Sequence, residues 1–170
     1  IAPTCAAFAR PARTTDTTAA TGASDVIVAG GGTTRNIVLA GMGADRVNAP
    51  PLVGTDPAAA VSSGSDIVVG DNGFVTWDTA GRVTQFASTL PALGGNDVVF
   101  VGDGDNIVVG GVGADTITAG AGNDTIAGDN AQVDYWAGST QVKKAQTTDN
   151  TVDQPSWGDT IVTGGGTNIV

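Results

Sequence analysis

The chain has 170 residues, with 17 acidic side chains, 7 basic ones and no histidine, which gives a net charge of −10. All of its acidic residues are aspartates and 26 residues are glycines, and both types disfavour helices, so a mainly helical fold is excluded. The acidity excludes nucleic acid as a partner, and no run approaches the roughly 20 apolar residues of a membrane span, which excludes membrane insertion. Without histidine, a catalytic triad and a histidine-ligated zinc site are excluded too.

The first part of the chain contains four short rows, each with one Asp or Asn ahead of aliphatic residues. We expect residues 1–23 to be a linker and the tail of an insertion from a preceding module. We predict that each row is a short strand, and that residues 48–64, with three prolines, form an irregular loop. The rows are Asp25-Val26-Ile27, Asn36-Ile37-Val38, Asp45-Arg46-Val47 and Asp66-Ile67-Val68.

An aromatic segment follows the fourth row. The triplet Gly70-Asp71-Asn72 leads into two arms of alternating apolar and polar residues around Thr79-Ala80-Gly81. Alternation on both sides of a glycine-containing turn predicts a β-hairpin, here over about residues 71–90.

The second set of rows is the most regular part of the chain. Asp97, Asn106, Asp115 and Asp124 are nine residues apart, and a glycine-rich turn precedes each row. Gly128-Asp129-Asn130 then opens a second predicted hairpin at about 129–148, and a third set begins with Asp159 and Asn168. The repeat divides the chain into a preceding tail, two modules and the start of a third, at residues 1–23, 24–95, 96–157 and 158–170. We therefore expect a window from a longer repetitive polypeptide.

Three of the four rows between Gly94 and Asn130 fit the pattern G-G-x-G-x-D-x-U-x, in which U is a large aliphatic residue. In this stretch the sequence resembles the RTX, or haemolysin-type, calcium-binding repeats. The resemblance implies an all-β fold, a parallel β-roll (a β-solenoid) with β-hairpin insertions, in which two rows make one coil and alternate rows share a flank. The expected inward ladder is Ile27, Val38, Val47, Val68, Val99, Val108, Ile117, Ile126, Ile161 and Val170.

The same resemblance implies a set of Ca²⁺ ligands. In the RTX pattern the ion lies between turns two rows apart, and it binds the row aspartate and backbone oxygens of the glycine turns. The residues at matching positions are Asp97, Gly102, Gly104, Gly111, Gly113, Asp115, Gly120, Gly122 and Asp124. Asp103 and Asp105, within one turn, and the other row aspartates, Asp25, Asp45, Asp66 and Asp159, are further candidates.

Charge gives a physical reason for a cation. If alternate rows stack, Asp97 and Asp115 lie about 5 Å apart, where two carboxylates repel by roughly 3 kcal/mol at an effective dielectric of about 20. Ca²⁺ prefers carboxylate and carbonyl oxygens and would remove this repulsion. Asn106 halves the charge of its site, so we expect tighter binding beside Asp97 and Asp115. The alternative is a metal-free solenoid in which Asp and Asn side chains bond neighbouring turns.

The regular spacing of the acids does not favour an enzyme, since a catalytic carboxylate pair has no need to repeat. We predict a non-catalytic calcium-binding structural segment of a large secreted or cell-surface bacterial repeat protein, such as an adhesin stalk, surface layer or extracellular filament, exported by a type I route. Its partners would be calcium ions and neighbouring modules or copies in a filament or lattice. The main alternative is the RTX secretion domain of an exported protease, lipase or toxin. A surface-binding solenoid with outward threonine ladders ranks last.

The aromatic side chains leave two interpretations open. They either cover the surface of the roll itself or contact a neighbouring rod or module, because aromatic residues are frequent at interfaces. The residues concerned are Phe74, Trp77, Phe86, Tyr135, Trp136 and Trp157.

Overall fold

The computed structural model describes residues 11–15, 18, 22–29, 32–49, 63–148 and 158–170. Most of the predicted loop at 48–64, and Trp157, lie outside these residues. Where the chain is described, its regular elements are β-strands, and it contains no helix long and apolar enough to cross a membrane.

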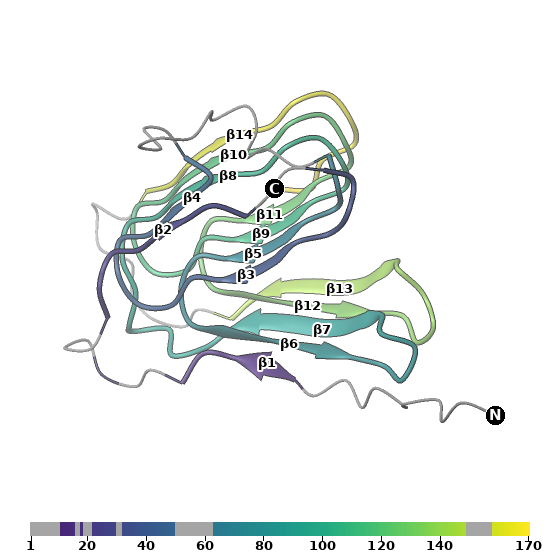
Figure 1. Cartoon of the computed structure of the whole chain (residues 1–170), viewed down its shortest axis with the longest axis horizontal. Helices are drawn as coiled ribbons and strands as arrows, with labels where there is room; N and C mark the ends of the chain where they lie inside the picture. Colours follow the sequence, from purple (N-terminus) through teal and green to yellow (C-terminus); the bar gives the residue numbers. More distant parts are fainter. Residues whose placement is uncertain (1–10, 16–17, 19–21, 30–31, 50–62, 149–157) are drawn as a thin grey trace.

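The rows form two parallel sheets that face each other, as Figure 1 shows. Alternate rows lie in the same sheet, which confirms the predicted β-roll. The first sheet has the order β14-β10-β8-β4-β2 and the second the order β11-β9-β5-β3. The strands of the first are β2 (Val26–Ile27), β4 (Arg46–Val47), β8 (Val98–Phe100), β10 (Thr116–Thr118) and β14 (Thr160–Val162). Those of the second are β3 (Ile37–Leu39), β5 (Ile67–Val69), β9 (Ile107–Val109) and β11 (Thr125–Ala127).

The third residue of a row, counting its Asp or Asn as the first, points into the roll and stacks on its counterpart. In the first sheet Val47, Val99 and Ile117 are in register, and each is at most 1% exposed. A row this short buries little apolar surface alone, but stacked rows bury a continuous aliphatic ladder. The prediction for Val170 is wrong: this side chain is 73% exposed, and no described row covers it.

Both predicted hairpins are present. Within the first, the Asp78 carboxylate accepts hydrogen bonds from the backbone N–H groups of Ala80 and Arg82, and Gly81 takes the positive φ of 78° that closes the turn. The sequence did not predict that the hairpins join. They form one antiparallel sheet with the order β1-β6-β7-β12-β13. Its strands are β1 (Ala12–Arg13), β6 (Gly73–Trp77), β7 (Val83–Ser88), β12 (Ala131–Tyr135) and β13 (Val142–Thr147).

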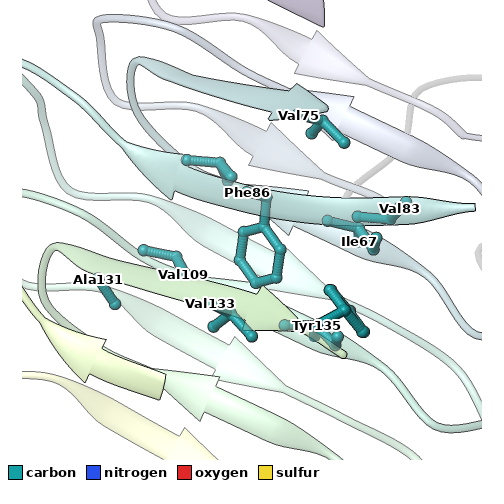
Figure 2. Packing of buried hydrophobic residues seen from close by; sticks show 10 residues of the cluster. Ile67, Val75, Val83, Phe86, Val109, Ala131, Val133 and Tyr135 are labelled. Carbon is teal, nitrogen blue, oxygen red and sulfur yellow. The ribbon is translucent and has the colours of Figure 1, made fainter. Parts of the chain in front are cut away.

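This hairpin sheet is a third layer that packs on the outer face of β5 and β9. Residues that flank the inward position of those strands, such as Ile67 and Val109, form one apolar cluster with Phe86, Val133 and Tyr135 of the hairpins. Figure 2 shows the Phe86 ring between the two sheets. Phe86 and Tyr135 thus cover the roll itself, whereas Trp136 is 55% exposed.

Candidate metal centre

The turns ahead of the strands stack into two columns of row residues. We call the column of Asp25, Asp45, Asp97, Asp115 and Asp159 the aspartate edge, because each residue directly precedes a strand of the first sheet. The mixed edge, ahead of the second sheet, contains Asn36, Asp66, Asn106, Asp124 and Asn168. The nine-residue spacing predicts this separation of Asp97 and Asp115 from Asn106 and Asp124.

One oxygen of each row side chain links two coils. Along the aspartate edge, the backbone N–H of each aspartate donates to Oδ1 of the aspartate on the next coil. The bond from Asp45 to Asp97 is 2.8 Å long, the bond from Asp97 to Asp115 is 2.8 Å, and the bond from Asp115 to Asp159 is 2.9 Å. The mixed edge repeats the bond, for example from the Asn106 N–H to Oδ1 of Asp124 at 3.1 Å. The row residues therefore hold the coils in register, as the metal-free alternative requires.

The second oxygen of the aspartates has no such partner. Each of these residues is at most 1% exposed, and within the part of the chain that the structure describes no hydrogen bond reaches the buried Oδ2 of Asp45, Asp97, Asp115 or Asp124. A buried carboxylate oxygen without a partner carries a desolvation cost of several kcal/mol if it is charged. Hydrogen bonding between coils therefore accounts for only one of the two oxygens of each carboxylate.

Burial raises the pKa of these carboxyls. The pKa of Asp97 rises to about 9, because the group is removed from water and lies near the charges of Asp71 and Asp115. The pKa of Asp115 rises to about 7, also through burial, with the charges of Asp159 and Asp129 adding to it. Without a cation, burial thus favours the protonated form of Asp97 and Asp115.

Glycines bring turn carbonyls close to the free carboxylate oxygens. A Cβ atom on Gly110 would collide with Oδ2 of Asp115 and the carbonyl oxygen of Gly128. A Cβ on Gly70 would collide with the equivalent pair, Oδ2 of Asp97 and the carbonyl oxygen of Gly110. One carboxylate oxygen and one carbonyl oxygen from a neighbouring coil therefore converge at each of these glycines.

This donor set fits a calcium ion. It consists of oxygen atoms alone, which a hard cation prefers, and it contains charged oxygens that lack any other partner. Within the described residues no three acidic side chains converge on one point. Turn carbonyls would therefore have to supply most of the ligands, as the glycine-rich turns allow.

The remaining predicted residues differ in their surroundings. Asp25 is exposed and Asp159 is half-buried, whereas Asp66 is 2% exposed and its Oδ1 accepts from the Asn36 N–H at 2.8 Å. Asp103 and Asp105 are exposed, and each accepts a 2.8 Å hydrogen bond from the next coil, from the N–H groups of Ala121 and Asn123 respectively.

The glycines at 102, 104, 111, 113, 120 and 122 lie in the stacked turns, where Gly111 and Gly113 have φ of 119° and 132°.

Sequence reasoning missed Asp71 at the aspartate edge. This residue is fully buried, and its carboxylate accepts hydrogen bonds from the backbone N–H groups of Gly95 and Val112. Burial raises its pKa to about 8, and the nearby charge of Asp115 adds to the shift. Its place in the repeat was the signal that the sequence offered, because Gly70-Asp71 follows β5 as Gly110-Gly111 follows β9.

Neither a curated protein nor a solved structure matches this chain. A family model does match part of it, across the regular rows whose turns build both edges. Residues 91–126 thus contain four copies of the RTX calcium-binding nonapeptide repeat, and RTX repeats bind Ca²⁺.

Proposed function

We propose that this chain is a non-catalytic, calcium-stabilised structural segment of a secreted or cell-surface repeat protein, as in a stalk, surface layer or filament. RTX repeats typify proteins secreted from bacteria. The observation that carries the structural role is the hairpin sheet, which runs beside the roll and has its own repeated junction.

The junction between successive hairpin strands repeats in the same register. Ala12 of β1 lies opposite Val75 of β6, and Phe86 of β7 lies opposite Val133 of β12. Val75 and Val133 are the third residues of β6 and β12, so the two pairings correspond.

A hydroxyl group supports both junctions in the same way. Thr14 Oγ1 accepts from the Gly73 N–H at 3.0 Å, and Ser88 Oγ accepts from the Ala131 N–H at 2.9 Å. Gly73 and Ala131 open the first strands of the two hairpins. Thr147 of β13 is equivalent to Ser88 of β7, because each pairs with the first strand residue of its own hairpin. Ser88 pairs with Gly73, and Thr147 pairs with Ala131. In this proposal the edge of β13 receives a further hairpin of the same kind, and the sheet grows with the roll.

Calcium is the folding trigger in this proposal. At the low calcium level inside a cell, folding would have to bury the residues of the aspartate edge without a cation, so the acidic chain stays extended. Extracellular modules bind calcium at about 0.1–1 mM, so export would load the sites and convert binding energy into folding energy.

Electron microscopy of the native protein tests the structural role. We expect continuous rods, fibres or a lattice in calcium, and their loss on treatment with a chelator. Discrete particles with one large globular body would contradict the proposal, because a catalytic or pore-forming passenger is what the secretion-domain alternative requires.

A further inference from the structure

The mixed edge contains a nitrogen atom in surroundings that suit a cation. Nδ2 of Asn106 donates to the carbonyl oxygens of Gly102 and Gly104 at 2.8 and 2.9 Å and to Oδ1 of Asp124 at 3.0 Å. Two turn carbonyls and one carboxylate oxygen therefore surround a single side-chain NH₂ group. Its two N–H bonds are shared among three oxygen acceptors, and the group is buried with its residue at 0% exposure.

A second asparagine of the mixed edge makes part of the same arrangement. Nδ2 of Asn168 donates to the carbonyl oxygen of Gly164 at 3.2 Å, and Gly164 precedes Asn168 by the same four residues that separate Gly102 from Asn106. The contact follows from the row position, because the turn presents its carbonyl oxygens to whichever side chain ends it.

The aspartate edge has a turn with the same glycine spacing but without the donor. Gly111 and Gly113 precede Asp115 as Gly102 and Gly104 precede Asn106, and Gly104 and Gly113 share a positive φ, of 105° and 132°. An ionised Asp115 has no N–H to offer these carbonyls, and its own Oδ2 is buried without a partner. The two turns thus differ at the residue that ends them: where Asn106 supplies a partial positive charge, Asp115 supplies another oxygen.

We infer that the Asn106 amide takes the place of a calcium ion, so that the turn 102–106 closes without metal and the calcium sites of this coil lie on the aspartate edge. The inference rests on the proposed calcium-stabilised roll. Gly102 and Gly104 are then not ligands in the calcium-loaded protein. The presence of Asp or Asn at a row position determines whether the turn before it requires calcium.

A reciprocal pair of substitutions in the full chain tests the inference. Asn106→Asp removes the NH₂ group and adds a carboxylate, so we expect one additional bound Ca²⁺ by titration calorimetry and a higher calcium concentration at the midpoint of folding. Asp115→Asn supplies the missing donor to Gly111 and Gly113, so we expect at least one fewer bound Ca²⁺ and a lower calcium concentration at the midpoint of folding. Gln141→Glu is the matched control, because it makes the same change from amide to carboxylate at an exposed position of the second hairpin and leaves the Asn106 amide in place.

The outcomes separate this inference from the proposed function. Opposite changes in calcium stoichiometry for Asn106→Asp and Asp115→Asn, with no change for Gln141→Glu, would support it. If the wild-type chain binds calcium but Asn106→Asp gains no ion, or Asp115→Asn needs more calcium to fold, the inference is wrong and the calcium-stabilised roll stands. If the wild-type chain binds no calcium at all, the proposed function itself fails.

Discussion

Asp97 and Asp115 occupy the same position on adjacent coils, where the backbone N–H of Asp97 donates a 2.8 Å hydrogen bond to Oδ1 of Asp115. Oδ2 of both residues is buried and has no hydrogen-bond partner among the described residues. Each carboxylate therefore has two separate tasks. One oxygen fixes the register of the coils, and the other is available to a cation. This division explains how the same column can be both a structural ladder and a metal site.

Gly110→Ala is expected to weaken both folding and calcium binding. The new Cβ would collide with Oδ2 of Asp115 and the Gly128 carbonyl oxygen. The Gly128 oxygen belongs to the backbone, and the buried Asp115 carboxylate is held by the Asp97 N–H, so neither can easily move away. Overpacking of this kind costs about 1–3 kcal/mol, which corresponds to about 5- to 150-fold in apparent calcium affinity. Calcium titration followed by circular dichroism measures the effect. Gly165→Ala is the control, since its Cβ would meet nothing within 4 Å; equal behaviour of the two variants would contradict the site.

The metal-free roll is expected to become more stable as the pH falls. The pKa values of Asp97, Asp71 and Asp115 are raised to about 9, 8 and 7, mainly by burial, from an ordinary value of 3.8. The folded chain therefore binds more protons than the unfolded chain, so this contribution is complete below about pH 4 and is lost as the pH rises through about 7 to 9.

Far-ultraviolet circular dichroism in metal-free buffer across this range checks the sign, because β-structure should increase as the pH falls. Calcium binding must displace these protons, so calcium should stabilise the chain most at the alkaline end and proton release should accompany binding. β-Structure that increases with pH in the absence of metal would show that these carboxyls are ionised in the folded roll.

Phe86→Ala is expected to lower the free energy of unfolding by about 3–5 kcal/mol, because the ring is fully buried between the hairpin sheet and the roll. Chemical denaturation in saturating calcium measures it, and calcium stoichiometry should not change. Trp136→Ala is the aromatic control: this residue is 55% exposed, and its loss should cost no more than about 0.5 kcal/mol. Similar losses for the two variants would mean that the hairpin sheet does not stabilise the roll.

Ser88→Ala tests the junction between the hairpins. It removes the acceptor of the Ala131 N–H and leaves this buried donor unsatisfied, at an expected cost of about 1–3 kcal/mol. Denaturation of the variant beside Thr140→Ala, which alters an exposed hydroxyl at the tip of the second hairpin, gives the comparison. A Ser88→Ala protein as stable as the control would show that the Ser88 hydroxyl does not stabilise the junction.

The roll was predictable because its pattern is local. A nine-residue period with two rows to a coil fixes which rows stack, so the partners of Val99 and Ile117 and the edge of each row residue follow from counting. The hairpins were predictable as hairpins for the same reason, since alternation around Gly81 or Gly138 needs no knowledge of the rest of the chain.

The missing features depend on distant contacts. The pairing of β7 with β12 joins residues more than 40 positions apart, as Ser88 and Ala131 are, and no local pattern encodes it. Asp71 belongs to the aspartate edge only because its turn resumes at Gly94 after the hairpin. The role of the Asn106 amide depends on where two carbonyl oxygens point, which spacing alone leaves open.

The central claim is that calcium between the buried carboxylates of the aspartate edge folds this roll. The most direct measurement is far-ultraviolet circular dichroism of the 170-residue chain during calcium titration from metal-free buffer at neutral pH, with calorimetry on the same samples. We predict a cooperative gain of β-structure with calcium, heat of binding in the same concentration range, and reversal by chelator. Full β-structure in metal-free buffer, with no heat on addition of calcium, would contradict the account and leave the side-chain ladder as the sole source of register.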